Sequence, residues 1–175
     1  SCSARRLMEQ EMRNLQRAVE QSANTILITD TDGNIVFVNP AFTTTSGYAA
    51  SEVLGKNPRI LKSGFQAEGY YRELWRTIKN NESWQGVFRN RRKDGSLYWE
   101  AATISPIRDA DGSVIHYVAV KEDITARKEA EEELQRVNQE LRDQLRQNEE
   151  LRAILSEQAL RDPLTNLYNR RYLDE

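Results

Sequence analysis

Residues 84–120 read WQGVFRNRRKDGSLYWEAATISPIRDADGSVIHYVAV, and this segment has the clearest structural pattern in the chain. Three runs rich in β-branched and aromatic residues are separated by two turn signals, Asp94-Gly95 and Asp109-Ala-Asp-Gly112. An Asp-Gly pair between two such runs is typical of a β-hairpin. The pattern predicts consecutive antiparallel strands at residues 84–92, 96–107 and 114–120.

The residues before this segment predict two more strands and three helices. Two β-rich runs, 25–29 and 34–38, flank the turn Asp30-Thr-Asp-Gly33, which indicates another hairpin. Asn39 before a proline can cap the first helix, and Gly47 can end it. The helices are expected at residues 39–47, 51–55 and 66–80, with a loop or short turn at 57–61. The order β-β-α-α-α-β-β-β predicts an α+β fold, in which a five-stranded antiparallel sheet carries the helices on one face.

An amphipathic helix is expected before this domain. Met8, Met12, Leu15 and Val19 recur at helical spacing, which predicts a helix over residues 1–20. The apolar stripe suits a helix that packs on the domain and also a helix that forms a dimer. The spacing alone does not distinguish these two roles, and we expect the helix to combine them.

A long helix is expected after the domain, because residues 113–162 contain neither glycine nor proline. Residues spaced alternately four and three apart predict a parallel coiled-coil dimer over 126–160, about 50 Å long. A single surface helix is the alternative. The heptad positions are Ala130, Leu134, Val137, Leu141, Gln144, Asn148, Leu151, Leu155 and Gln158. A polar residue such as Asn148 commonly fixes the register of a two-stranded coil.

The composition argues against several classes of protein. The chain has 175 residues and a formal net charge of −2, so no strong attraction to nucleic acid is expected. Its one cysteine, Cys2, and its one histidine, His116, argue against a disulfide framework, a metal cluster and a serine–histidine triad. No apolar run is long enough to cross a membrane, and residues 1–17 lack the centre of a signal peptide. The low cysteine count suits a cytoplasmic protein.

Two polar residues lie on strand faces that should point into the core. Side chains alternate along a strand, so Asn90 shares a face with Trp84 and Phe88. If the matching face of the next strand also points inward, Glu100 joins Asn90. A buried amide or carboxylate needs a hydrogen-bond partner. That partner is backbone or water in one interpretation, and a planar heterocyclic ligand in the other.

Six short motifs occur in order along the domain: Asn39-Pro-Ala-Phe42, Gly47-Tyr48, Glu52-Val-Leu-Gly-Lys-Asn57, Trp84-Gln-Gly86, Asn90-Arg-Arg-Lys-Asp-Gly95 and Asp123-Ile-Thr125. Together they resemble the PAS domain with its C-terminal PAC segment. The resemblance covers about residues 21–125, and the PAS fold agrees with the element order predicted above. PAS domains are sensory modules, some of which bind a flavin, haem or a small metabolite and some of which bind nothing.

The same motifs help to distinguish among PAS ligands. Haem-binding PAS domains of the oxygen-sensor type use a histidine on the long helix, and residues 66–80 contain none, so haem is not expected. The run Gly55-Lys-Asn-Pro-Arg-Ile-Leu61 resembles the motif of blue-light LOV domains, but Pro58 stands where their reactive cysteine would be. The cysteinyl-flavin adduct of LOV domains therefore cannot form. Lys121 also replaces the strand glutamine used in LOV signalling.

The chain most resembles PAS redox sensors that bind FAD, as in nitrogen-fixation regulators and aerotaxis receptors. Those domains share Leu-Trp on the long helix, Trp-x-Gly and Asn-Arg-Arg-Lys-Asp, all of which are present here. The resemblance implies that Trp75 flanks the flavin, Asn90 hydrogen-bonds the edge of its ring and Asn57 lines the pocket mouth. Glu100 is a further expected pocket residue, although it departs from the amide of LOV domains. FAD is the expected cofactor, and an empty or small-metabolite pocket is the alternative.

The end of the chain carries a second resemblance. Residues 161–172, RDPLTNLYNRRY, look like the opening segment of GGDEF diguanylate cyclases. The metal-binding and GGDEF motifs of that family lie downstream and are absent from this sequence, so the chain itself is not expected to be an enzyme. The expected division is an N-terminal helix at 1–20, a PAS domain at 21–125, a coiled-coil signalling helix at 126–160 and a truncated GGDEF start at 161–175.

The order of PAS domain, coiled-coil helix and cyclase opening segment predicts the sensory and dimerisation region of a diguanylate cyclase. A ligand or redox signal in the pocket is expected to act through Asp123, Ile124 and Thr125 on the coiled coil, and so to regulate cyclic di-GMP synthesis. The expected partners are a second copy, in a parallel homodimer, and a small molecule or flavin. Neither nucleic acid nor a membrane is expected. The alternatives are a ligand-free or metabolite-binding domain that only holds a dimer together and, with least support, a free-standing enzyme. The expected dimer seam comprises Leu134, Val137, Leu141, Asn148, Leu151 and Leu155.

Overall fold

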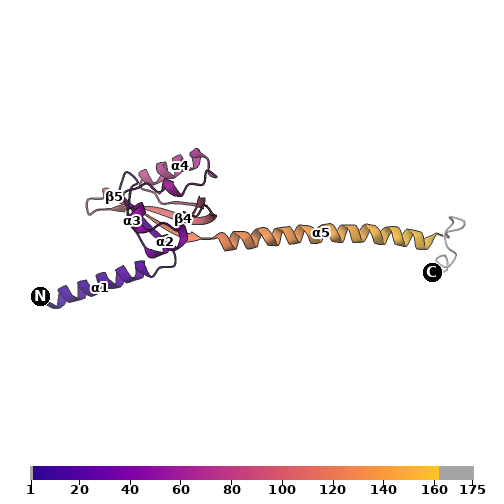
Figure 1. Cartoon of the computed structure of the whole chain (residues 1–175), viewed down its shortest axis with the longest axis horizontal. Coiled ribbons are helices and arrows are strands. Elements are labelled where there is room, and N and C mark those ends of the chain that lie inside the picture. The colour runs from indigo at the N-terminus through magenta and orange to yellow at the C-terminus, as the bar shows by residue number, and fades with distance from the viewer. Residues whose placement is uncertain (1, 162–175) are drawn as a thin grey trace. The chain divides into compact units, whose positions relative to one another are not determined.

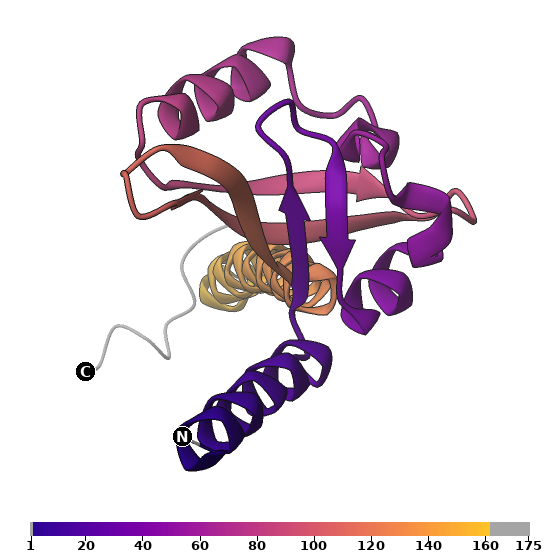
Figure 2. The same cartoon turned by 90° about the vertical axis from the view of Figure 1, so that its left-hand side faces the viewer.

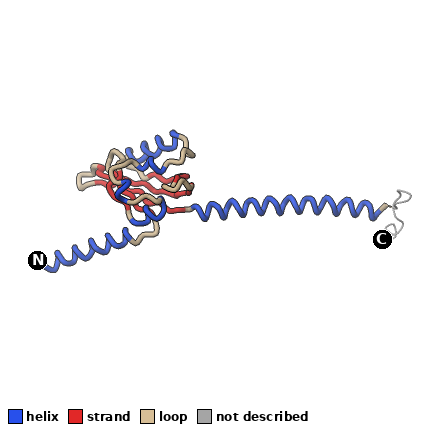
Figure 3. Tube along the Cα trace, viewed as in Figure 1, coloured by secondary structure: helices blue, strands red, loops and turns tan. Residues whose placement is uncertain are grey.

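The computed structural model describes residues 2–161 of the chain, so the predicted cyclase segment lies outside the described residues except for Arg161. The chain divides into two compact units, the first ending at Ala126 and the second beginning at Arg127. Figures 1 and 3 show the helices and strands of both units.

The first unit contains one five-stranded antiparallel sheet with the strand order β2-β1-β5-β4-β3. The hairpins β1–β2, β3–β4 and β4–β5 pair neighbours in sequence, while β1 pairs with β5 and brings the two ends of the domain together. The sheet confirms the predicted α+β class. Its strands are β1 (Thr25–Thr29), β2 (Ile35–Val38), β3 (Trp84–Arg91), β4 (Leu97–Arg108) and β5 (Val114–Asp123).

Two of the hairpin turns are built alike. The backbone N–H of Gly33 donates to the carbonyl of Asp30 at 3.1 Å, and the Asp30 carboxylate accepts the N–H of Asp32. Asp109 and Gly112 repeat this arrangement in the turn between β4 and β5. The two glycines have φ angles of 86° and 85°, in the left-handed region that favours glycine.

Four helical segments connect β2 to β3. They are α2 (Pro40–Ser46), α3 (Ala50–Val53), the 3₁₀ helix η1 (Pro58–Leu61) and α4 (Glu68–Lys79). As predicted, Asn39 caps α2 and Gly47 ends it in a left-handed conformation. α3 begins before the expected cap Ser51, because the Glu52 carboxylate binds the backbone N–H of Ala49 at 2.8 Å.

The helices pack on one face of the sheet and form two hydrophobic clusters with it. Figure 2 shows α4 on one side of the strands. Buried and exposed residues alternate along β3 and β4, which places Trp84, Phe88 and Asn90 on the covered face. One cluster joins α2, α3 and η1 to β1, β2 and β5; the other joins α4 to β3, β4 and β5.

Two further helices flank this domain in the sequence. In α1 (Cys2–Glu20), Met8, Met12 and Leu15 of the predicted apolar stripe are exposed, as is Leu7, whereas Val19 is half-buried. α5 (Thr125–Leu160) is one continuous helix, and the apolar residues of its expected seam are between 49% and 62% exposed. The coiled coil stays a prediction. No helix within residues 2–161 combines the length and the apolar character that spanning a membrane requires.

Candidate functional site

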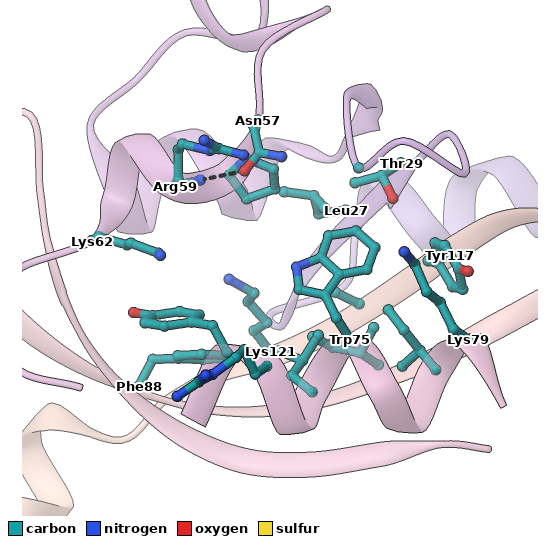
Figure 4. Close-up of a pocket in the computed structure, with 18 of the residues that line it drawn as sticks. Leu27, Thr29, Asn57, Arg59, Lys62, Trp75, Lys79, Phe88, Tyr117 and Lys121 are labelled. Carbon is teal, nitrogen blue, oxygen red and sulfur yellow. Dashed lines mark hydrogen bonds between the residues drawn. The ribbon is translucent and has the colours of Figure 1, made fainter. Parts of the chain in front are cut away.

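A cavity of about 570 Å³ lies between α4, η1 and the covered face of the sheet. Figure 4 shows its side chains converging from these elements. The volume falls within the usual range for small-molecule sites. Most of the wall is apolar or aromatic, and its larger apolar side chains are Leu27, Tyr71, Leu74, Trp75, Ile78, Phe88, Ile104 and Tyr117.

Three elements meet where Trp75, Asn57 and Gly33 approach one another. A Cβ atom at Gly33 would lie 2.8 Å from Cη2 of Trp75 and 3.1 Å from Nδ2 of Asn57. The bare backbone of the β1–β2 turn is therefore required for the indole and the amide to reach it. Asn57 is held in place because its Oδ1 accepts the backbone N–H of Arg59 at 3.0 Å, which caps η1 (Figure 4).

A buried polar cluster lies beside the cavity. Nδ2 of Asn90 donates to Oε2 of Glu100 at 2.8 Å, and Nζ of Lys121 lies 3.2 Å from the same oxygen. Asn90 and Lys121 also line the cavity, whereas Glu100 lies behind them. The partners that a buried Glu100 requires are thus supplied by the protein. The sequence grouped Asn90 with Glu100, but it did not reveal that Lys121 completes the cluster.

Tyr70 fixes α4 to β3 beside the cavity. Its hydroxyl donates to the carbonyl of Val87 at 2.9 Å and accepts the N–H of Val87 at 2.8 Å. A Cβ at Gly86 would lie 2.3 Å from this hydroxyl and from the ring of Trp84. The glycine of the Trp84-Gln-Gly86 motif therefore makes room for Tyr70. Burial raises the pKa of the Tyr70 hydroxyl, which keeps it protonated as a donor.

Exposed cations surround the mouth of the cavity. Lys62 belongs to this group, and its Nζ lies 3.6 Å from the centre of the Tyr71 ring. Glu68 is the one acid among the described residues that line the cavity. The mouth is therefore positively charged and suits an anionic ligand group. The exposed cations are Arg59, Lys62, Arg72, Arg76 and Lys79. These cations were not predicted from the sequence, although the spacing of Arg72, Arg76 and Lys79 puts them on one helix face.

The expected relay segment is tightly tied to the end of the sheet. Oδ1 of Asp123 accepts the hydroxyl of Thr125 at 2.5 Å and its N–H at 3.0 Å, while Oδ2 accepts Nη2 of Arg92 at 2.9 Å. The Thr125 hydroxyl in turn accepts the N–H of Trp99, and Ile124 is buried and donates its N–H to the Trp99 carbonyl. Arg92 was not identified from the sequence as part of this junction.

The electrostatics of the junction favour the charged form of Asp123. Burial raises the pKa of this carboxyl, but the hydrogen bonds from Thr125 and Arg92 outweigh burial and hold the pKa below its ordinary value. The guanidinium of Arg92 also lies over the ring of Tyr98, 4.3 Å from its centre. Tyr98 adjoins the buried cluster, because it is paired across the sheet with Asn90.

The structure thus places Asn57, Trp75 and Asn90 around one cavity and Glu100 directly behind it. Within residues 2–161, no three histidine, cysteine, aspartate or glutamate side chains gather where they could hold a metal ion. The arrangement offers apolar walls, two amides and a cationic mouth, which can bind a planar organic ligand with an anionic end.

Comparison with known proteins agrees with this geometry. Residues 23–126 match the PAS domain family. The chain is 37% identical over 107 residues to the nitrogen fixation regulatory protein of Klebsiella oxytoca, an alignment that covers 61% of this chain and 22% of that protein. The chain spans about a fifth of the length of the curated relatives it matches first.

Two solved structures share the fold. An RNA-binding light-oxygen-voltage receptor matches with a TM-score of 0.64 and 33% identity, over 71% of this chain and 36% of that chain. A light-oxygen-voltage domain whose mechanism was studied with a flavin analogue matches with a TM-score of 0.59 and 29% identity, over 73% of this chain and 96% of that chain. The chain therefore belongs to the PAS domain family, and it carries a PAS sensor domain.

Proposed function

We propose that this PAS domain binds a flavin, with FAD as the first candidate, and that the state of the flavin is its signal. The observation that carries the proposal is one cavity that combines aromatic walls, two amides and a cationic mouth. A bound flavin would supply redox chemistry, which no side chain of the site provides. The similarity to light-oxygen-voltage proteins, one of them studied with a flavin analogue, supports the same ligand class.

The chemistry of the lining residues fits the ring of a flavin. Flat aromatic side chains, including Trp75 and Phe88, suit the faces of a planar ring. Asn57 and Asn90 offer amide donors and acceptors, which suit the polar edge of such a ring. One N–H of Asn90 is bound to Glu100, and this bond orients the amide toward the cavity.

The mouth fits the phosphate end of a flavin nucleotide. Arginine and lysine are the usual partners of phosphate oxygens, and five such cations line the mouth. The flavin would be held without a covalent bond, because Pro58 occupies the position of the LOV cysteine. Haem fits less well, because α4 carries no histidine.

The signal would leave the pocket through the junction at the end of the sheet. Asn90 and Tyr98 are a cross-strand pair, and Arg92 lies over the Tyr98 ring while binding Asp123. A change in the cluster beside the cavity can therefore alter the contacts that hold Asp123 and Thr125. Because Thr125 is the first residue of α5, the same contacts hold the first turn of the long helix.

We assign the output to a diguanylate cyclase, on the strength of the RDPLTNLYNRRY segment at residues 161–172. Two chains would pair in parallel through the seam of α5, so that the two cyclase domains meet. The exposed apolar side chains of α5 support this pairing. They also favour a second candidate function, in which the PAS domain only maintains the dimer and its pocket carries no signal.

The absorption spectrum and mass spectrum of the native preparation distinguish these functions. The flavin proposal predicts a yellow protein that releases FAD, and predicts that Asn90→Ala lowers the FAD content about tenfold through loss of one amide contact. Asn138→Ala, which changes an exposed amide on α5, is the matched control and should leave the content unchanged. A colourless protein that takes up no flavin on refolding with FAD would support the dimerisation function instead.

A further inference from the structure

The least expected group in the cavity is the buried ammonium of Lys121. This residue lies on β5, where its side chain is 7% exposed, and Figure 4 shows its nitrogen on the cavity side. The sheet register explains how a long side chain fits there. On one side Lys121 is paired with Ala102, which is paired with Gly86, so the positions on that side carry little or no side chain. On the other side it is paired with Thr25.

The protein meets only part of the hydrogen-bonding capacity of the ammonium, whose other contact is the Phe88 ring, with its centre 5.4 Å from the nitrogen. The ammonium has three N–H donors, and the structure gives it one hydrogen-bond acceptor among the described residues, Oε2 of Glu100 at 3.2 Å. Asn90 donates to the same oxygen, so one carboxylate oxygen serves two donors. A buried cation favours any further acceptor or negative charge that enters its surroundings. The side of Lys121 that can receive such a group is the cavity.

We propose that Lys121 makes the cavity prefer the reduced, negatively charged form of a redox ring over the oxidised, neutral form. This proposal rests on the flavin binding proposed above. Reduction of a bound flavin would move two electrons from a low-potential donor, which would be oxidised by two electrons, and one proton from solution onto the neutral ring, and so leave the ring with one negative charge. Lys121 lines the cavity and its partner Glu100 does not, so the cation is nearer to the ring than the carboxylate that partly offsets it. The positive charge therefore stabilises that product more than the starting ring, which raises the reduction potential.

The position of Lys121 separates its role from that of the other cations. The cations at the mouth are exposed, as Lys62 and Lys79 illustrate, whereas Lys121 is the buried cation among the described lining residues. The phosphates of a bound FAD would remain at the exposed mouth, because charged groups are costly to remove from water. The ring is the part of the ligand that enters the apolar interior, where a nearby charge acts with little screening.

The test is the reduction potential of bound FAD, measured by titration with dithionite against a reference dye. The main comparison is between the wild type and the double variant Glu100→Gln with Lys121→Gln, which removes both buried charges and keeps hydrogen-bonding groups. We expect the double variant to bind reduced FAD at least about tenfold less tightly relative to oxidised FAD, which corresponds to a potential lower by about 30 mV. Glu100→Gln alone keeps the cation and should raise the potential.

Lys56→Gln is the matched control, because it removes one exposed positive charge outside the cavity lining. Its potential should equal that of the wild type. An unchanged or higher potential in the double variant would overturn the role of Lys121. If Glu100→Gln does not fold, the comparison of the wild type with the double variant still tests the role of Lys121. The double variant is expected to fold because it leaves no buried charge unpaired. A wild type that takes up no FAD would instead refute the flavin proposal itself.

Discussion

Substituting the glycine of one turn tests how the cavity is built. Gly33 and Gly112 occupy equivalent positions in two Asp-x-Asp-Gly turns, with nearly equal φ angles of 86° and 85°. Their surroundings differ. A Cβ at Gly33 would meet Trp75 at 2.8 Å and Asn57 at 3.1 Å, whereas a Cβ at Gly112 would have nothing within 4 Å. The alanine variants therefore share the same backbone strain, and only Gly33→Ala disturbs the cavity.

The expected magnitudes follow from these contacts. A left-handed conformation costs an ordinary residue about 1–2 kcal/mol, so Gly112→Ala should lower the free energy of unfolding by about that amount. Carbon atoms pack at about 3.5–4.0 Å, so the indole of Trp75 must move by close to 1 Å to admit the new methyl group. Overpacking of this kind costs a further ~1–3 kcal/mol. Gly33→Ala should thus lose about 2–5 kcal/mol in total.

Urea unfolding followed by circular dichroism measures both free energies, and FAD uptake by the refolded proteins measures the effect on the cavity. We expect Gly33→Ala to be the less stable variant by at least about 1 kcal/mol, and to bind FAD more weakly than Gly112→Ala. Equal stability losses, within the ~0.5 kcal/mol spread of such comparisons, would show that Trp75 does not pack against this turn as described.

Three further predictions concern the capping residue, the junction and the long helix. Asn39→Ala removes a buried side chain that forms hydrogen bonds with four backbone groups, so urea unfolding should show a loss of about 2–3 kcal/mol; a loss below ~1 kcal/mol would contradict its anchoring role. The pKa of Asp123 is lower in the folded chain than its ordinary value of 3.8. Its charge therefore stabilises the fold above that pH, and the contribution disappears as the pH falls below it. Unfolding midpoints of Asp123→Asn should consequently change less between about pH 7 and about pH 3 than those of the wild type, and an equal change would argue against the hydrogen-bonded carboxylate. Leu141→Glu places a charge in the expected seam of α5, so sedimentation should show monomers where the wild type forms dimers; a wild type that is already monomeric would refute the seam.

Local signals in the sequence predicted most of the elements. Asp-Gly turns between β-rich runs defined the hairpins, because such turns specify pairing between neighbours in the chain. The pairing of β1 with β5 joins segments some ninety residues apart, and no local pattern specifies it. η1 was expected only as a loop or short turn, yet Asn57 caps it and holds Pro58–Leu61 as a helical turn.

The candidate site was predictable only in part, because it depends on contacts between elements. Alternation along β3 and β4 placed Asn90 and Glu100 on the covered face, as the structure also shows. The burial of Lys121 could not be anticipated, since it depends on a register that sets Ala102 beside it. Likewise, position 86 requires glycine only because the hydroxyl of Tyr70, on α4, contacts β3 there, and that contact is not visible in the sequence.

Whether the cavity between α4 and the sheet holds a flavin ring can be observed directly. The most direct measurement is a crystal structure of the full chain grown in saturating FAD. We expect density for the ring inside the cavity, bordered by Asn57, Trp75 and Asn90, with the phosphates among the exposed cations of the mouth. A cavity that contains only water under these conditions, or a ring bound elsewhere on the chain, would contradict the flavin proposal.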